Sequence, residues 1–147
     1  MKKTYILFTF LSLVILSCGI SPLPIDYNHD ECAYCKMKIA DARFGAELVT
    51  SKGKVFKFDS AECLIWSYIN DENTEYAYLL VTDYSKPHQF INAQEATFLI
   101  SENLPSPMGG NLSSFEQIDV ANYMRKEKGG DLLMWNQLTE KYRDLYL

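Results

Sequence analysis

Hydrophobic and polar positions beyond residue 43 follow strand-like and helix-like patterns in turn. The predicted strands of the first half are 44–50, 55–58 and 76–82. The turn signal Ser51-Lys52-Gly53-Lys54 joins the first two strands in a hairpin. Apolar residues then recur at helical spacing from about Ser60 to Asn70, and we expect Asp59 to be the N-cap with Glu62 completing a capping box. The order is strand, strand, helix, strand.

The second half repeats this order. The corresponding elements are strands at 96–100, 111–113 and 132–135 and helices at 114–128 and 137–146. Ser114 is the expected N-cap of the first of these helices, and Gly129-Gly130 ends it. Units of this size bury little surface alone. The pattern therefore predicts an α+β protein of two similar ββαβ halves, about 31–86 and 87–147, packed together with a C-terminal helix.

The N-terminus has the pattern of a bacterial export signal. Lys2 and Lys3 precede an apolar run at 5–16 that is too short to span a bilayer as a helix. The sequence Leu16-Ser17-Cys18-Gly19 resembles a lipobox, in which the signal peptide is cut off before a cysteine that becomes lipidated. We expect residues 1–17 to be removed and Cys18 to carry the lipid, with the body in the periplasm.

The segment that follows has no periodicity. Residues 18–30 contain Pro22 and Pro24 and predict a flexible tether, so the folded domain is expected at 31–147. Of the 147 residues, 48% are hydrophobic, which is ample for a core. The net charge of −5 and the lack of a basic stripe argue against general nucleic-acid binding.

The stretch Cys32-Ala33-Tyr34-Cys35-Lys36-Met37 places three sulfur side chains within six residues. Thiolates and thioethers are soft ligands that favour Cu(I). Cys35 and Met37 are two residues apart, and in an extended segment they would face the same side as a ligand pair. The alternative is a Cys32–Cys35 disulfide with Met37 as a core residue.

Three cysteines remain once Cys18 is assigned to the lipid, and an odd number cannot all pair within the chain. Cys32 has three open roles: a copper ligand, a disulfide partner of Cys35, or a switch between the two states. Cys63 falls in the first turn of the predicted helix, where the helix dipole favours a thiolate. It is either an auxiliary ligand or redox residue, or a buried small hydrophobic residue.

Methionines and histidines complete the set of candidate ligands. Met108 lies in a loop rich in Pro and Gly, where it is better placed to reach a ligand than to fill a core. Met124 and Met134 lie on regular elements and are expected in the core. His29 is either an additional ligand or a solvated residue of the tether, and His88 is the weaker candidate.

Several segments occur together in a fixed order: Cys32-x-x-Cys35-Lys36-Met37, Phe44-Gly45-Ala46-Glu47-Leu48, Lys52-Gly53-Lys54-x-Phe56-x-Phe58-Asp59 with Cys63, and Ser106-Pro107-Met108-Gly109 with Phe115 downstream. In this order, and with the lipoprotein signal, they resemble the NosL family, the accessory lipoproteins of nitrous oxide reductase. The resemblance implies an envelope Cu(I) chaperone of two ββαβ halves. It would deliver copper for maturation of nitrous oxide reductase and work with an ABC-type membrane complex.

The resemblance also assigns residues. The family's Cys-x-Met ligand pair corresponds to Cys35 and Met37, and its methionine in the Pro-Met-Gly loop corresponds to Met108. One departure is Lys36, where the family pattern leads us to expect glycine. Two other functions stay open: a thiol–disulfide oxidoreductase using Cys32 and Cys35, and an interaction module with a structural zinc site.

Overall fold

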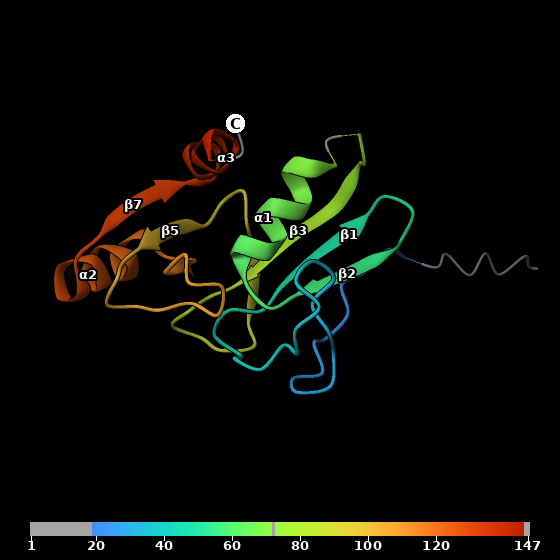
Figure 1. The fold of residues 1–147 in the computed structure, drawn as a ribbon, viewed down its shortest axis with the longest axis horizontal. Coiled ribbons are helices and arrows are strands. Elements are labelled where there is room, and N and C mark those ends of the chain that lie inside the picture. The colour runs from blue at the N-terminus through green and yellow to red at the C-terminus, as the bar shows by residue number, and fades with distance from the viewer. Residues whose placement is uncertain (1–18, 72, 146–147) are drawn as a thin grey trace, which may run out of the picture.

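A computed structural model describes residues 19–71 and 73–145 of the chain. Its elements are β1 (Ala46–Thr50), β2 (Val55–Phe58), α1 (Ala61–Asn70), β3 (Tyr76–Thr82), β4 (Phe90–Asn92), β5 (Thr97–Ile100), β6 (Leu112–Phe115), α2 (Ile118–Lys128), β7 (Asp131–Met134) and α3 (Trp135–Asp144) (Figure 1). None of the helices in these two ranges has the length and apolar character needed to cross a membrane. The predicted signal peptide and Cys18 lie outside the described residues.

The strands form two antiparallel sheets, with orders β2-β1-β3-β4 and β6-β5-β7. Each sheet has the first strand of its ββαβ unit in the centre. Phe58 pairs with Ala46 at the end of the first hairpin, and Phe115 pairs with Thr97 at the same place in the second. The α+β prediction of two similar halves with a C-terminal helix is confirmed; the short strand β4 was not predicted.

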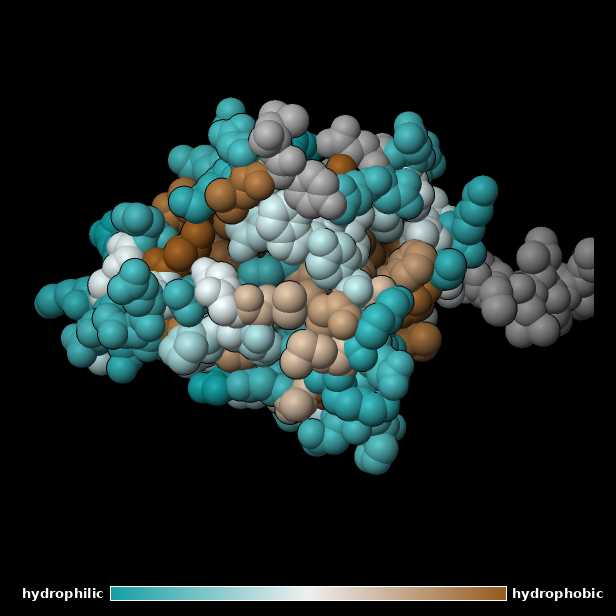
Figure 2. Space-filling model, viewed as in Figure 1, coloured by the Kyte–Doolittle hydropathy of each residue, from teal (hydrophilic) through white to brown (hydrophobic). Residues whose placement is uncertain are grey.

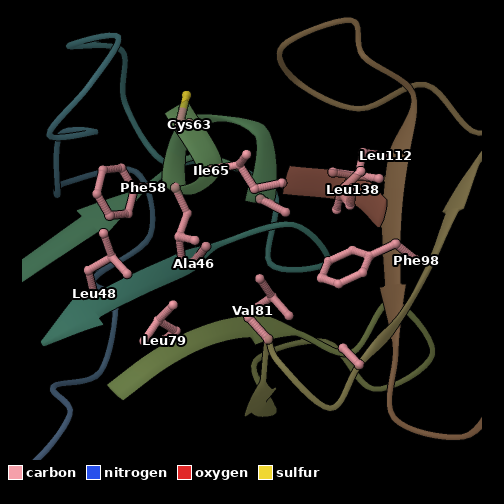
Figure 3. Close-up of a cluster of buried hydrophobic side chains, with 14 of the residues drawn as sticks. Ala46, Leu48, Phe58, Cys63, Ile65, Leu79, Val81, Phe98, Leu112 and Leu138 are labelled. Carbon is pink, nitrogen blue, oxygen red and sulfur yellow. The ribbon is translucent and has the colours of Figure 1, made fainter. Parts of the chain in front are cut away.

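The two halves share one hydrophobic core. Figure 3 shows Leu48 and Phe58 of the first half, with Phe98, Leu112 and Leu138 of the second half, in one cluster. Helix α1 lies along one face of the first sheet (Figure 1). A smaller cluster under α2 contains the buried side chains of Leu99, Leu104, Phe115 and Ala121. On the face in Figure 2, hydrophilic side chains predominate, and hydrophobic ones form separate small groups.

Strand β1 is buried on both faces along its whole length. Ala46 and Leu48 face the core under α1 (Figure 3), and by strand alternation Glu47 and Val49 face the opposite side. The residues that cover this second face come from the N-terminal segment. The Leu23 N–H donates to Glu47 Oε1 at 2.9 Å.

Other bonds fix the same N-terminal segment. Lys57 Nζ donates to the Pro24 carbonyl at 2.7 Å, and the Tyr78 hydroxyl donates to the Ile20 carbonyl at 3.4 Å. The part of the predicted tether from Ile20 onward therefore has hydrogen-bonded contacts with the first sheet. The reason is that β1, at the centre of its sheet, needs a cover on its second face.

The predicted N-caps differ from the observed ones. The N-cap of α1 is Ser60, without a side-chain capping bond. Asp59, the predicted cap, is buried, and its carboxylate accepts a hydrogen bond from the Ala40 N–H instead. Glu62, the expected partner in a capping box, accepts a hydrogen bond from Ser106. Both predictions were wrong because tertiary partners compete with local capping.

Helix α2 begins later than predicted. Its N-cap is Gln117, whereas Ser114 belongs to β6 and donates from its hydroxyl to the Thr82 carbonyl at 2.6 Å. The bond joins the second sheet to the end of β3. Ser114 was assigned to the helix because its hydroxyl suits an N-cap, but here it satisfies a buried carbonyl.

Candidate metal-binding site

The Cys32–Met37 stretch forms the end of a small hairpin that spans residues 30–39. The Cys32 N–H donates to the Met37 carbonyl at 2.8 Å, and the Ile39 N–H donates to the Asp30 carbonyl at 3.0 Å. These antiparallel bonds hold the two cysteines of the motif at the closed end of the hairpin.

The turn at the closed end brings the first two thiols together. The Lys36 N–H donates to the Cys32 carbonyl at 3.0 Å, and the Cys35 N–H donates to Cys32 Sγ at 3.5 Å. Lys36 has φ 65°, the left-handed conformation that glycine adopts most easily. The conformation explains why a glycine was expected there. It also means that residues 35–37 are not extended, so their spacing alone does not place Cys35 and Met37 on one side.

Two contacts attach the hairpin to the first sheet. The Ala33 N–H donates to the Lys57 carbonyl of the edge strand β2 at 2.8 Å. At the open end of the hairpin, Lys57 Nζ lies 2.7 Å from Asp30 Oδ2. Strand β2 leads directly into α1, so the same connection sets the hairpin beside the start of that helix.

Cys63 is the third residue of α1 and a buried member of the core cluster, and its sulfur points away from the other labelled side chains in Figure 3. The Sγ atoms of Cys32, Cys35 and Cys63 all lie within 4.8 Å of one another. Over residues 19–71 and 73–145, no other group of three His, Cys, Asp or Glu side chains is close enough to hold a metal. All three cysteines are free thiols; Cys32 and Cys63 are buried, and Cys35 is half-buried. A metal would therefore be reached through Cys35.

The three thiols have different pKa values because their surroundings differ. The Cys63 thiol and the backbone N–H groups of Asp59, Cys35 and Tyr34 donate hydrogen bonds to Cys32, which lowers its pKa to about 5. The pKa of Cys63 is raised by its hydrogen bond to Cys32 and by burial, and burial also raises the pKa of Cys35. Cys32 is therefore the most acidic of the three thiols.

The other predicted ligands are two methionines and two histidines. Met37 and Met108 are both exposed, at 55% and 36%. The His29 ring is exposed and lies 3.0 Å from Asp26 Oδ1, and the His88 ring contacts Tyr27 edge-on. Neither imidazole joins the three thiols. The ligand roles of Met37 and Met108 stay predictions.

Two methionines were expected in the core. Met124 is half-buried and packs on the cluster under α2. Met134 is 44% exposed, so its assignment to the core was wrong. It is the last residue of the edge strand β7, and its sulfur accepts a weak hydrogen bond from the Thr97 hydroxyl.

Comparison with known proteins places this site in a family. The family model of NosL matches residues 23–143. The chain belongs to the NosL family. A solved structure, the copper chaperone NosL from Shewanella denitrificans, is 28% identical, with a TM-score of 0.68 over 81% of this chain and 96% of that chain. A comparison with curated proteins found no match.

The span that matches NosL contains all the candidate ligands in the described residues. The three clustered cysteines, Met37 and Met108 lie within residues 23–143. Sequence reasoning did not find the contact of Glu62 with Ser106, which connects the Met108 loop to the start of α1. The two residues are far apart in the chain, and no local pattern pairs them.

Proposed function

We propose that this NosL-family protein is a Cu(I) chaperone of the cell envelope, which binds copper as cargo and passes it on without catalysing a reaction. The observation that carries the proposal is the cluster of three Sγ atoms within 4.8 Å, of which only Cys35 is partly exposed. The structural relative at 28% identity is named a copper chaperone, which supports the same role here.

The donor set fits Cu(I) better than zinc. Three sulfurs satisfy a low-coordinate soft ion, whereas a structural zinc site is usually closed by four Cys or His ligands. Cys32 and Cys63 hold the ion from the buried side, and the accessible Cys35 exchanges first with a ligand of the partner. Met37 and Met108 supply neutral thioethers, which bind Cu(I) without losing a proton.

A thiol–disulfide oxidoreductase is less consistent with the site. Such an enzyme needs an accessible thiolate as its nucleophile. The thiol with the lowered pKa is Cys32, which is 0% exposed.

The proposed client is nitrous oxide reductase, whose copper centres would be loaded together with an ABC-type membrane complex. The family membership supports this client. We further propose that Cys18 carries a lipid and that the described domain lies in the periplasm, as the lipobox-like sequence indicates.

A Cu(I) titration of the reduced protein against a competing chelator tests the copper proposal. We expect one-to-one binding that Cys63→Ser, Met37→Leu and Met108→Leu each weaken by about tenfold or more, since each removes a ligand. Met134→Leu is the matched control, because Met134 is also exposed but lies on β7. Equal binding by wild type and Cys63→Ser would overturn the assignment of the three-cysteine site.

A separate experiment tests the client. The copper content of nitrous oxide reductase would be measured in cells that make this protein, in cells that lack it, and in cells that make Cys63→Ser. We expect copper-depleted reductase in the last two. Full copper content in the absence of this protein would contradict the client and leave the copper chemistry untouched.

A further inference from the structure

We propose that Glu62 is a positioning residue that fastens the Met108 turn to the first turn of α1, beside Cys63. Here the Met108 turn means residues 106–110. The inference rests on the proposed role of Met108 as a copper ligand and adds a residue that the ligand assignment does not include.

One end of the Met108 turn is held by a hydrogen bond. Ser106 is buried, and its hydroxyl donates to Glu62 Oε1. The Gly109 N–H donates to the Ser106 carbonyl at 3.0 Å and closes the turn. Met108 lies between these residues at the exposed tip. The bond to Glu62 therefore fixes the base from which Met108 projects.

The other end of the turn meets the same carboxylate. A Cβ atom built on Gly110 would lie 2.9 Å from Glu62 Oε1 and 3.2 Å from the Tyr142 hydroxyl. Both distances are shorter than ordinary contacts, so any side chain at position 110 would have to displace the Glu62 carboxylate or the Tyr142 hydroxyl. Ser106 and Gly110 thus hold both ends of the turn against one side chain of α1.

Stability alone does not account for Glu62. Its side chain is 2% exposed, and Oε2 is buried without a hydrogen-bond partner. A buried carboxylate with an unpaired oxygen costs free energy that an apolar residue of similar size would not. Glu62 does not cap α1 either, and its carboxylate does not belong to the cluster of three thiols.

The arrangement gives the start of α1 two neighbours that carry sulfur. Hairpin 30–39 brings Cys32 and Cys35 to Cys63. Glu62, the residue before Cys63 in the helix, holds the Met108 turn. Glu62 therefore links the position of the thioether at 108 to the position of the thiol at 63.

A double-mutant cycle tests the proposal. In Cu(I) competition titrations of the reduced protein, we expect Ser106→Ala to weaken binding about tenfold when Met108 is present and to have no effect in Met108→Leu. Glu62→Gln keeps the acceptor oxygen for Ser106 and should bind as wild type does. Ser101→Ala is the control: Ser101 begins the loop that leads to the Met108 turn, and its hydroxyl donates to the carbonyl of Lys128 at the end of α2, not to Glu62.

Amide hydrogen exchange of the metal-free protein gives a second measurement that does not depend on copper. The Gly109 amide should exchange faster in Ser106→Ala and unchanged in Ser101→Ala. Unchanged exchange in Ser106→Ala, or equal loss of affinity with and without Met108, would overturn the proposal. If wild type binds no Cu(I), the proposed function fails, while faster exchange at Gly109 in Ser106→Ala and in Glu62→Leu would still show that the bond between Ser106 and Glu62 anchors the turn.

Discussion

The backbone N–H of Cys35 donates a hydrogen bond to the Sγ of Cys32 over 3.5 Å. The turn thus stabilises a thiolate at Cys32 and sets the Cys35 side chain beside it. The proximity of the sulfurs has a second consequence, because thiols that are close enough to share a metal ion are also close enough to oxidise.

We expect mild oxidation of the metal-free protein to consume two of the three thiols and to abolish Cu(I) binding until a reductant is added. A thiol-reactive dye would count the free thiols before and after oxidation, using protein that begins at residue 19. Protein loaded with Cu(I) beforehand should keep all three thiols. Loss of thiols at the same rate with and without copper would show that copper does not bind at these residues.

Lys36→Gly should stabilise the protein. A side chain at φ 65° costs roughly 1–2 kcal/mol, and glycine removes this cost. Glycine also increases the conformational entropy of the unfolded chain, which offsets part of that stabilisation. We expect a net increase of about 0.5–1 kcal/mol in the free energy of unfolding, measured with urea. Lys38→Gly, on the paired arm of the same hairpin, should be destabilising. A loss of stability in Lys36→Gly would contradict this account of the turn.

Glu47→Gln should stabilise the protein relative to wild type, and the difference should grow as the pH rises. Burial raises the pKa of Glu47 above its ordinary value of 4.5, so the fold favours the protonated form. The favourable contribution of Glu47 to the free energy of unfolding is fully present below pH 4.5. It is lost as the pH rises through the pKa of Glu47 in the folded protein. Urea unfolding at several pH values should show wild type and variant equal in acid and diverging toward neutral pH.

The control for this measurement is Glu75→Gln, a substitution at an exposed side chain. It should change the free energy of unfolding by less than about 0.5 kcal/mol at every pH. A difference between Glu47→Gln and wild type that does not depend on pH would show that Glu47 is not the group responsible.

Gly130→Ala should cost far more stability than Gly129→Ala. Both glycines have positive φ, 99° and 72°, but a Cβ at 130 would lie 2.1 Å from the Ile100 carbonyl oxygen, and one at 129 meets nothing within 4 Å. We expect losses of about 3 kcal/mol and about 1 kcal/mol, measured by thermal or urea unfolding. Similar losses at the two positions would mean that the β5–β7 approach can relax.

The regular elements were predictable because their patterns are local. Strands β2 and β3 have the predicted bounds, since short runs of β-prone residues mark both ends clearly. The repeat of the two halves was also visible in the order of the elements, although the second helix begins at Ile118 and not at the predicted 114. The structure confirms Cys63 in the first turn of α1 for the same reason.

Contacts between distant residues were not predictable. Ser106 and Glu62 pair through tertiary packing, and Glu62 looks like an ordinary capping residue in the sequence. The N-terminal segment has no hydrophobic period, and only the sheet reveals that Glu47 needs a cover. Lys36 was noted only as a departure from an expected glycine, and its left-handed conformation was not predicted because a lysine carries no sign of it.

The contact of Ile20 with Tyr78 limits how far this domain can reach from Cys18. If Cys18 carries the lipid, as we propose, two residues connect it to the first contact with the sheet, at most roughly 7 Å of extended chain. The domain would then rest on the bilayer, and the contacts between its N-terminal segment and the first sheet would set its orientation. The sulfur cluster would sit at a fixed height above the lipid, and a partner embedded in the same membrane would meet it by lateral diffusion.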